Sequence, residues 1–468
     1  MKSLGFILSH LTSQPRRRRN LEAARAPRKL PAGTSGHIVL AALGPIEDAL
    51  IRRATRARRP YVILVANVEE AFSLNDRGYK VMVGELDDPE TYRAARVVDA
   101  ALVASTLPDT SNANLAFTVR EIDGEVPVVV TASSEPAASV LQLAGASAVI
   151  ELGQMLGEAM ARRVLGDSDS HVVGAIDDLV IAEASVAGTP LAGRTLGELA
   201  VREGCGVNVV GVLERGVFRP WAPDLATTPR SVLVMAGNAE LFARYDARYG
   251  SRRLVEAPVV IIGAGHVGTA AAEVLGAAGI EHTIIERRGP AAPGSADGRW
   301  VVGDAAALDV LERAGLREAA ALLVTTHDHD VNTYLTLYIR RLCPEVQIIS
   351  RANHDRNVST LHRAGADAVL SYASLGATAI WNEISDDDSL VLAEGIDVFR
   401  VPVPTWLAGR TLAETDLHNA TGCNVIGLVR NGSGQVEPAP GPDEVVSEAA
   451  SLVLVGDSES EDRFYSRA

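Results

Sequence analysis

The chain contains a long internal repeat. Residues 191–196, LAGRTL, recur letter for letter as residues 407–412, 216 positions later. Residues 144–149 match residues 364–369 with one substitution, at a spacing of 220. Because order and spacing persist over about two hundred residues, a low-complexity coincidence is excluded and a tandem duplication is predicted. Any fold must therefore be built twice within the 468 residues.

Each copy is predicted to contain two different parts. In the first part, short Val- and Ile-rich runs alternate with longer stretches rich in Ala, Leu, Arg and Glu, which is typical of a parallel, doubly wound sheet. The second part carries strand-like runs, such as residues 208–213 and 451–455, between Gly, Pro and Asn. In the second copy the predicted elements are strands over 259–262, 282–286, 321–324 and 346–350 and a helix over 269–278. The predicted fold class is therefore α/β, with two tandem Rossmann-like domains, each followed by a small α+β lobe.

Short, polar and acidic stretches at 166–170 and 385–389 look like linkers between these parts. We therefore predict a basic arm, a first parallel-sheet lobe, a first C-terminal lobe, a second parallel-sheet lobe and a second C-terminal lobe. Their predicted ranges are residues 1–35, 36–166, 171–250, 254–385 and 390–468.

Charge and cysteine content exclude several function classes. The net charge is −15, although residues 1–35 carry eight basic side chains and one acidic one. The acidic remainder repels polyanions, so no nucleic-acid binding is expected. Cys205, Cys343 and Cys423 show neither a disulfide framework nor metal-ligand spacing, which favours a reducing compartment. The apolar opening stretch, residues 4–11, is far shorter than the about 18 residues that span a bilayer, so a cytoplasmic protein is expected.

A glycine motif in the second copy predicts a phosphate site. Gly263, Gly265 and Gly268 directly follow the predicted strand 259–262 and open a helix. The first glycine permits a tight turn, the second lets the backbone approach a pyrophosphate, and the third lets helix and strand pack closely. The helix N-terminus offers unpaired N–H groups to the anion. The alternative is that these glycines serve only strand–helix packing.

Glu286 ends the next predicted strand, 18 residues after Gly268, where a carboxylate would accept hydrogen bonds from ribose hydroxyls. This favours NAD(H), ATP or ADP. A 2′-phosphate would be repelled by Glu286 and partly attracted by Arg287 and Arg288, so NADP(H) is disfavoured without being excluded.

The first copy departs from this pattern. Ala42 and Glu47 stand where Gly263 and Gly268 stand, and Asn67 is aligned with Glu286. A carboxylate at position 47 would bring negative charge to the phosphate, so the first pocket is expected to be empty or to hold something other than a dinucleotide. Transferring this chemistry to the second copy, by Gly268→Glu, is expected to remove nucleotide binding.

Other candidates have competing interpretations. The residues His327 to Asp330, HDHD, suggest a metal site, but their place after a strand favours a nucleotide-side or helix-capping role. Arg351 ends a strand at the same sheet edge and would meet a phosphate, or else form a surface salt bridge. The acids 386–388 are a linker or, alternatively, a Ca²⁺ site. No hydrolase elbow, zinc-protease motif or Walker lysine is present, so no enzyme is expected.

These motifs resemble the RCK family, the regulators of K⁺ conductance. The resemblance rests on residues 259–268, the turn at Gly303 to Ala305, Thr325 and Thr326 with Asn332, residues 351–353, and the repeated LAGRTL segments. It implies a nucleotide site with the glycines at the phosphates, Glu286 at the ribose, Asp304 and Ala305 near adenine, and Arg351 near phosphate. The full set of implied ligand-binding residues is Gly263, Ala264, Gly265, His266, Val267, Gly268, Glu286, Arg287, Asp304, Ala305, Thr325, Thr326 and Arg351. Many relatives carry arginine at the place of His266, which implies weaker, pH-sensitive phosphate contacts here.

The resemblance also implies a function. In this family nucleotide or ion binding changes a ring of RCK domains beneath a K⁺ channel or transporter, and no reaction is catalysed. We therefore expect a cytoplasmic regulatory subunit or gating domain that forms a dimer or a four-chain ring, bound to a membrane K⁺ channel or transporter subunit. The alternatives are an NAD-dependent oxidoreductase and a nucleotide-sensing scaffold unrelated to transport.

The basic arm has two interpretations. Its apolar start and the arginines 16–19 suit a segment on the inner membrane face, with residues 1–30 as the contact. A pore helix ending just upstream would give the same layout. The alternative is a solvated, disordered tail.

Overall fold

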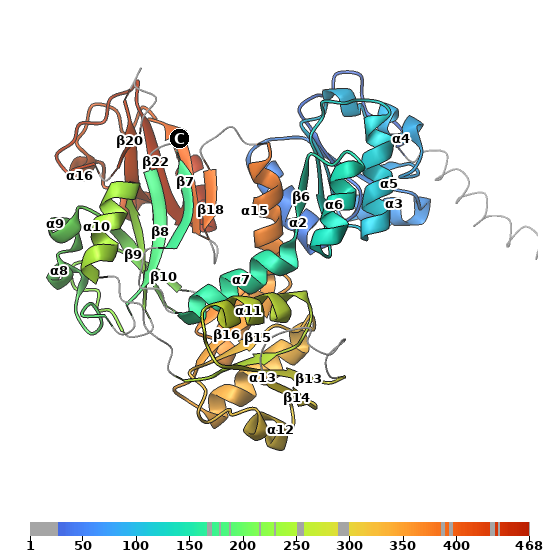
Figure 1. The fold of residues 1–468 in the computed structure, drawn as a ribbon. Coiled ribbons are helices and arrows are strands. Elements are labelled where there is room, and N and C mark those ends of the chain that lie inside the picture. The colour runs from blue at the N-terminus through green and yellow to red at the C-terminus, as the bar shows by residue number, and fades with distance from the viewer. Residues whose placement is uncertain are drawn as a thin grey trace, which may run out of the picture. The chain divides into compact units, whose positions relative to one another are not determined.

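The computed structural model describes residues 27–165, 171–176, 179–186, 189–214, 217–228, 231–249, 257–288, 299–384, 389–392, 396–430, 436–438 and 440–467. They form two compact units (Figure 1). The first unit is the described part of Met1–Leu152 together with Ala379–Ile384, and the second is the described part of Gly153–Thr378 and Ser385–Ala468. Most of the basic arm, and the acids 386–388, lie outside the described residues.

The first unit contains a six-stranded parallel sheet with strand order β3-β2-β1-β4-β5-β6. Its strands are β1 (Ile38–Leu40), β2 (Tyr61–Val65), β3 (Val81–Val83), β4 (Leu102–Ser105), β5 (Val128–Thr131) and β6 (Ala148–Ile150). Its helices are α2 (Pro45–Arg56), α3 (Val68–Asp76), α4 (Pro89–Ala94), α5 (Asp109–Arg120) and α6 (Glu135–Leu143), with a 3-10 turn, η1 (Val97–Asp99). The strands are short and almost entirely apolar because both faces of the sheet are covered.

The second unit repeats this sheet, in the order β14-β13-β12-β15-β16-β17. Its strands are β12 (Val259–Ile262), β13 (His282–Glu286), β14 (Arg299–Val302), β15 (Ala321–Val324), β16 (Gln347–Ala352) and β17 (Ala368–Ser371). Its helices are α11 (His266–Ala277), α12 (Leu308–Arg313), α13 (His329–Leu342), α14 (Val358–Ala364) and the part of α15 (Tyr372–Asn382) before Ala379, with a 3-10 turn, η2 (Asp355–Asn357). The predicted Rossmann-like topology is confirmed, and three of the four predicted strands agree residue for residue.

Two hydrophobic layers cover the second sheet. Strand residues such as Ile261 and Leu323 pack under α11, and their neighbours Val260 and Leu322 pack under α12 and α13. The helix that follows the first sheet, α7 (Leu152–Leu165), also packs on the α11 face, through Leu156 and Met160. Gly157 makes this approach possible, since a Cβ there would overlap the backbone of α11.

Two five-stranded antiparallel sheets complete the second unit, in the orders β10-β9-β11-β8-β7 and β18-β19-β22-β20-β21. The first comprises β7 (His171–Ile176), β8 (Leu179–Ser185), β9 (Asn208–Glu214), β10 (Val217–Pro220) and β11 (Val232–Gly237). The second comprises β18 (Ser389–Leu392), β19 (Ile396–Pro402), β20 (Asn424–Val429), β21 (Val436–Pro438) and β22 (Ser451–Asp457). Their helices are α8 (Leu196–Leu199), α9 (Val201–Cys205), α10 (Ala239–Tyr249), α16 (Leu412–Thr415), α17 (Leu417–Thr421) and α18 (Ser458–Tyr465).

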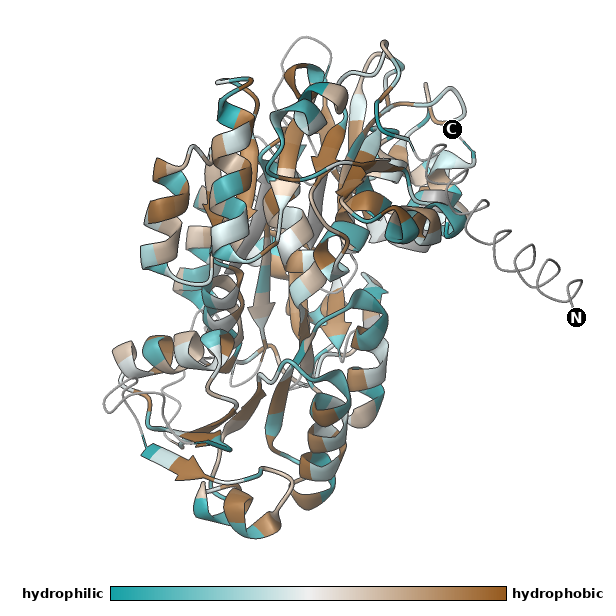
Figure 2. Ribbon diagram, turned by 90° about the vertical axis from the view of Figure 1, so that its right-hand side faces the viewer, coloured by the Kyte–Doolittle hydropathy of each residue, from teal (hydrophilic) through white to brown (hydrophobic). Residues whose placement is uncertain are grey.

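One continuous core joins these two sheets. Ile181 and Val234 from the first sheet and Val398 and Val453 from the second belong to the same buried cluster. The sheet strands are the most hydrophobic parts of the ribbon in Figure 2. The chain thus packs the equivalent lobes of its two copies against each other.

Candidate functional site

The glycine loop lies between β12 and α11, as predicted. Gly263 has φ +104°, in the left-handed region that favours glycine. Gly265 is the N-cap of α11, and its N-cap position supplies no side-chain hydrogen bond to the helix. Gly268 lies in the first turn, where an added Cβ would overlap the carbonyl oxygen of Gly263 and approach Thr325 Oγ1 to 2.9 Å. Gly268→Glu would therefore disturb the loop itself, so the expected selective loss of nucleotide cannot be tested with that variant.

Gly265 differs from the other two glycines. Its φ is −74°, which any residue adopts, and no heavy atom lies within 4 Å of a Cβ placed there. Neither backbone conformation nor packing against the protein requires glycine at this position. The open space lies at the N-terminus of a 12-residue helix, where backbone N–H groups and positive partial charge favour an anion. Ala264 and Gly265 are at least partly exposed, His266 is exposed as the first helical residue, and Val267 is buried in the core.

Glu286 lies against this loop. Its Oε2 accepts a hydrogen bond from the N–H of Ala264 at 2.9 Å, and its Oε1 accepts one from the N–H of Arg287 at 2.8 Å. Arg287 forms an exposed ion pair with Asp304 at 3.5 Å, and Ala305 is buried beside the same turn. The structure therefore brings these predicted residues together at the ends of β13 and β14, beside the glycine loop.

The end of β15, next to the glycine loop, is fixed by side-chain hydrogen bonds of Thr325, Thr326 and Asn332. Thr325 Oγ1 donates to a carbonyl oxygen of the loop, at 3.0 Å from both Ile262 O and Gly263 O. Thr326 Oγ1 donates to Asn332 Oδ1 at 2.5 Å. The Asn332 amide donates in turn to Thr326 O at 2.9 Å and Arg351 O at 3.0 Å. Asn332 is fully buried, and it ties the end of β15 to that of β16.

Arg351 lies on β16, two strands from β12 and so about 10 Å away across the sheet. Its Nε donates to Asn353 Oδ1 at 2.8 Å, and its guanidinium carbon lies 4.6 Å from the ring centroid of Tyr372. Burial lowers the pKa of Arg351, and Tyr372 opposes that lowering. Among the described residues no carboxylate pairs with it. Sequence reasoning missed Tyr372, whose only signal is its place directly after the last strand.

The HDHD segment acts as a helix cap. Asp328 is the N-cap of α13, and its Oδ1 accepts a hydrogen bond from the N–H of Val331 at 3.1 Å. No group of three or more His, Cys, Asp or Glu side chains suited to a metal ion occurs among the described residues. Of the three predicted roles, the structure shows the helix-capping one, through Asp328.

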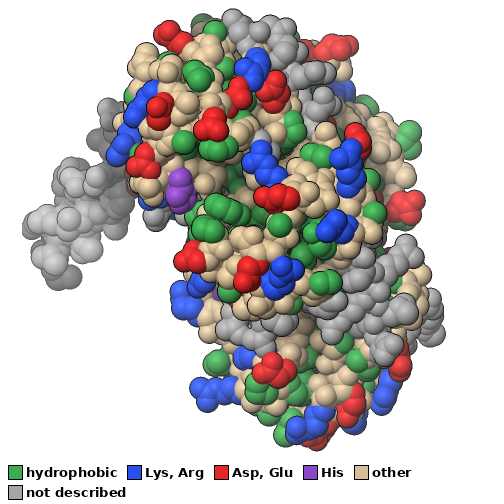
Figure 3. Space-filling view, turned by 90° about the vertical axis from the view of Figure 1, so that its left-hand side faces the viewer, with side chains coloured by type: hydrophobic (Ala, Val, Ile, Leu, Met, Phe, Trp, Pro, Cys, Tyr) green, Lys and Arg blue, Asp and Glu red, His purple; other side chains and the backbone are tan. Residues whose placement is uncertain are grey.

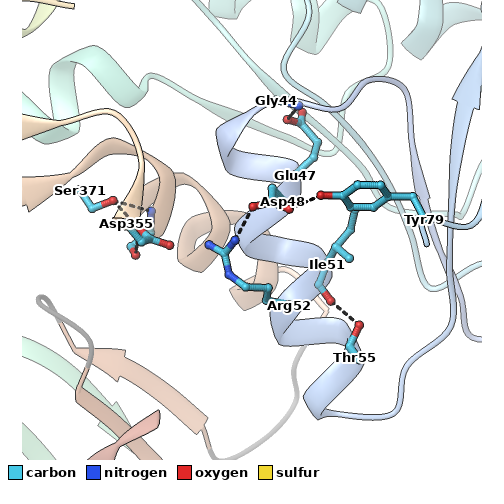
Figure 4. A network of polar contacts seen from close by, with 10 residues as sticks. Gly44, Glu47, Asp48, Ile51, Arg52, Thr55, Tyr79, Asp355 and Ser371 are labelled. Carbon is cyan, nitrogen blue, oxygen red and sulfur yellow. Dashed lines mark hydrogen bonds and ion pairs between the residues drawn. The ribbon is translucent and has the colours of Figure 1, made fainter. Parts of the chain in front are cut away.

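In the first copy, the helix N-terminus is already occupied by a carboxylate of the chain. Gly44 is the N-cap of α2, and Figure 4 shows the Glu47 side chain turned back toward it. Glu47 Oε2 accepts from the N–H of Gly44 at 2.9 Å, and Oε1 accepts from Thr106 Oγ1 at 2.5 Å. Glu47 is only 1% exposed. The negative charge that a ligand phosphate would bring is thus supplied internally.

One alignment of the two copies was wrong. Tyr61 pairs with Ile38 in the first sheet as His282 pairs with Val259 in the second. The residue equivalent to Glu286 is therefore Val65, two residues before Asn67. Asn67 instead caps α3, with its Oδ1 accepting from the N–H of Glu69 at 2.8 Å. The first copy therefore has an apolar residue at the position equivalent to Glu286.

Comparison with known proteins agrees with this architecture. Sequence models of the TrkA-N domain match residues 38–152 and 259–372, and the TrkA-C domain matches residues 398–468. The crystal structure of the GsuK RCK domain is 32% identical, with a TM-score of 0.65, and the match covers 94% of this chain and 97% of that one. The chain belongs to the RCK family. The predicted resemblance is thereby confirmed.

Two further relatives of this RCK chain are informative. A structure of the GsuK channel bound to NAD is also 32% identical with a TM-score of 0.65, covering 99% of this chain and 83% of that one. Potassium channel protein 1 of Methanocaldococcus jannaschii is 28% identical over 167 residues, which is 34% of this chain and 50% of the relative. The chain spans about half the length of the curated potassium channel relatives it matches first.

Proposed function

We propose that this RCK protein is a nucleotide-binding regulatory subunit or gating domain that controls a K⁺ channel or transporter. The observation that carries the proposal is the open space at Gly265, at the N-terminus of α11, beside the anchored carboxylate of Glu286. Protein packing does not explain that glycine, whereas a bound phosphate does. The proposed ligand is NAD(H), ATP or ADP, and the proposed binding residues are those that the sequence singled out.

The relatives support this ligand class and this setting. GsuK structures have been solved with NAD and with ADP, the latter for a structure 25% identical to this chain with a TM-score of 0.54. The relative from Methanocaldococcus jannaschii is named as a potassium channel protein. No helix among the described residues is both long and apolar enough to cross a membrane. We therefore propose that the chain acts on a separate or fused membrane subunit from its cytoplasmic side.

The alternative function is that of an oxidoreductase. Such an enzyme needs an acid or base beside the reacting atom of its substrate. Three of the polar side chains around the glycine loop, those of Thr325, Asn332 and Glu286, instead bond the backbone. We propose regulation without catalysis, by a homo-oligomer. The face drawn in Figure 3 mixes acidic and basic side chains, which gives no basic surface for nucleic acid on that face.

The test compares two glycine variants. Gly265→Asp places a carboxylate where the phosphate is proposed to bind. Gly124→Asp is the matched control, because it adds the same side chain at another exposed glycine with no heavy atom within 4 Å of the new Cβ. ADP or NADH at a hundredfold excess over Kd should stabilise the wild type and Gly124→Asp by about 2.7 kcal/mol. Gly265→Asp should fold and show no thermal shift.

The same samples test the other parts of the proposal. Light scattering with and without nucleotide should report a dimer or tetramer, and NADH should not be consumed with any substrate of a dehydrogenase panel. Steady turnover that depends on Gly265 would establish the oxidoreductase instead. A full thermal shift in Gly265→Asp would refute the site.

A further inference from the structure

Arg351 is a partly buried cation, and within the described parts of the chain it has contacts that hold it in place but no ion pair. Its Nε donates to Asn353 Oδ1, and its guanidinium carbon lies over the ring of Tyr372, the first residue of α15. A guanidinium that stacks on an aromatic ring uses its planar face, and the N–H donors at its edge stay available for an oxyanion. Tyr372 can therefore fix the orientation of Arg351 without using its phosphate-binding fork.

Among the described residues no carboxylate forms an ion pair that compensates the burial of this charge. Desolvation lowers the pKa of Arg351, and the only opposing influence comes from Tyr372. The other well-buried arginine of this lobe, Arg340, differs, because it pairs with the Asp367 carboxylate at 2.5 Å. A buried cation that lacks such a partner is better accommodated when an anion arrives.

The duplication provides an internal comparison. By strand register, Thr131 of the first copy stands at the place of Arg351, and Leu152 stands at that of Tyr372. Other features of the same sheet edge are kept in both copies: Asn112 donates to Thr131 O at 2.8 Å, as Asn332 donates to Arg351 O. Arg351 and Tyr372 are thus both present in the second copy, which has the glycine loop. Both are replaced in the first copy, where Glu47 bonds the N-terminus of α2.

We infer that Tyr372 is a positioning residue of the nucleotide site, holding the guanidinium of Arg351 ready to bind a ligand phosphate. This inference rests on the proposed function and adds a specific role for Tyr372, which the sequence motifs did not single out. Because Tyr372 begins α15, the contact also joins the phosphate side of the site to the first turn of that helix.

The experiment is a double-mutant cycle read by ADP affinity. Tyr372→Leu should weaken ADP binding roughly fivefold, the size expected for a lost cation–π contact. Tyr372→Phe keeps the ring and should stay within about twofold of the wild type. In an Arg351→Met background, Tyr372→Leu should cause no further loss, because its effect acts through the arginine.

Tyr334→Leu is the control, since Tyr334 is an exposed tyrosine of α13 that stacks on Tyr338. It should leave ADP affinity unchanged, and thermal unfolding without ADP should show that every variant folds. Unchanged ADP affinity in Tyr372→Leu, or an equal loss with and without Arg351, would overturn the positioning role while leaving the proposed function intact. A wild-type protein that binds no ADP, NADH or ATP would overturn the proposed function itself.

Discussion

At the scale of single residues, Gly263, Gly265 and Gly268 meet three different requirements. Gly263 adopts a left-handed backbone conformation. Gly268 has no room for a Cβ, because the carbonyl oxygen of Gly263 lies against it. At Gly265, by contrast, no heavy atom of the described residues lies within 4 Å of a Cβ placed there. Only the last is unexplained by the fold. It is therefore the position at which binding can be separated from folding.

Glu286 should set the choice between adenine dinucleotides. Its carboxylate is anchored to the loop by Ala264, and a negative charge there repels a 2′-phosphate. Glu286→Gln removes the charge and should weaken NADH binding roughly fivefold, since hydrogen bonds to charged groups exceed neutral ones by about 1 kcal/mol. The affinity for NADPH should fall less than that for NADH, or should rise, so the ratio of NADH affinity to NADPH affinity should fall.

Glu273→Gln, an exposed change on α11, is the control and should leave that ratio unaltered. If Glu286→Gln also leaves the NADH to NADPH ratio unaltered, Glu286 does not contact the ribose.

At the scale of elements, the repeated LAGRTL motif is a structural signature. In each copy its threonine is the N-cap of a short helix and forms a capping box: Thr195 with Glu198, and Thr411 with Glu414. The glycine of the motif has φ +79° at Gly193 and +78° at Gly409. The motif that revealed the duplication therefore specifies a turn and a helix start.

The capping boxes predict a pH dependence of stability. The backbone N–H of Thr195 is the main cause that lowers the pKa of Glu198, and the N–H of Thr411 does the same for Glu414. A folded-state pKa below the unfolded one gives stability that is complete above the usual value of about 4.3 and is lost as pH falls through the lowered value. Glu198→Gln and Glu414→Gln should thus unfold at lower temperature than the wild type at pH 7.

This difference should shrink as the pH falls below about 4.3, because the wild-type carboxylate then becomes neutral as well. Glu85→Gln, at an exposed loop carboxylate, should show no such trend. A difference that persists unchanged at acidic pH would mean that the charge of the capping glutamates does not stabilise the fold.

Sequence periodicity predicted the positions of the strands well, but it did not predict which helices and side chains pack against each other. The strands β12, β13 and β15 are visible as apolar runs with turn signals at their ends, because both their faces are buried. The packing of α7 on α11 joins residues about a hundred positions apart, and nothing local in α7 indicates it. The contact between Arg351 and Tyr372 was missed for the same reason, and Glu47 was predicted to repel a phosphate but not to replace it.

At the scale of the whole molecule, duplication has produced two unequal copies. The parallel sheets keep the same strand order, and the two small lobes share one core. At the sheet edge proposed to bind nucleotide, Glu47, Val65 and Thr131 replace Gly268, Glu286 and Arg351. One copy is therefore proposed to bind nucleotide and the other to serve as its structural counterpart.

The number of nucleotides bound per chain tests this account most directly. Isothermal titration of the full chain with ADP, at a protein concentration above Kd, gives that number independently of any assumed partner. The account predicts about one ADP per chain, because Glu47 closes the first copy and the space at Gly265 opens the second. Two equivalent sites per chain, or none for ADP, NADH and ATP alike, would contradict it.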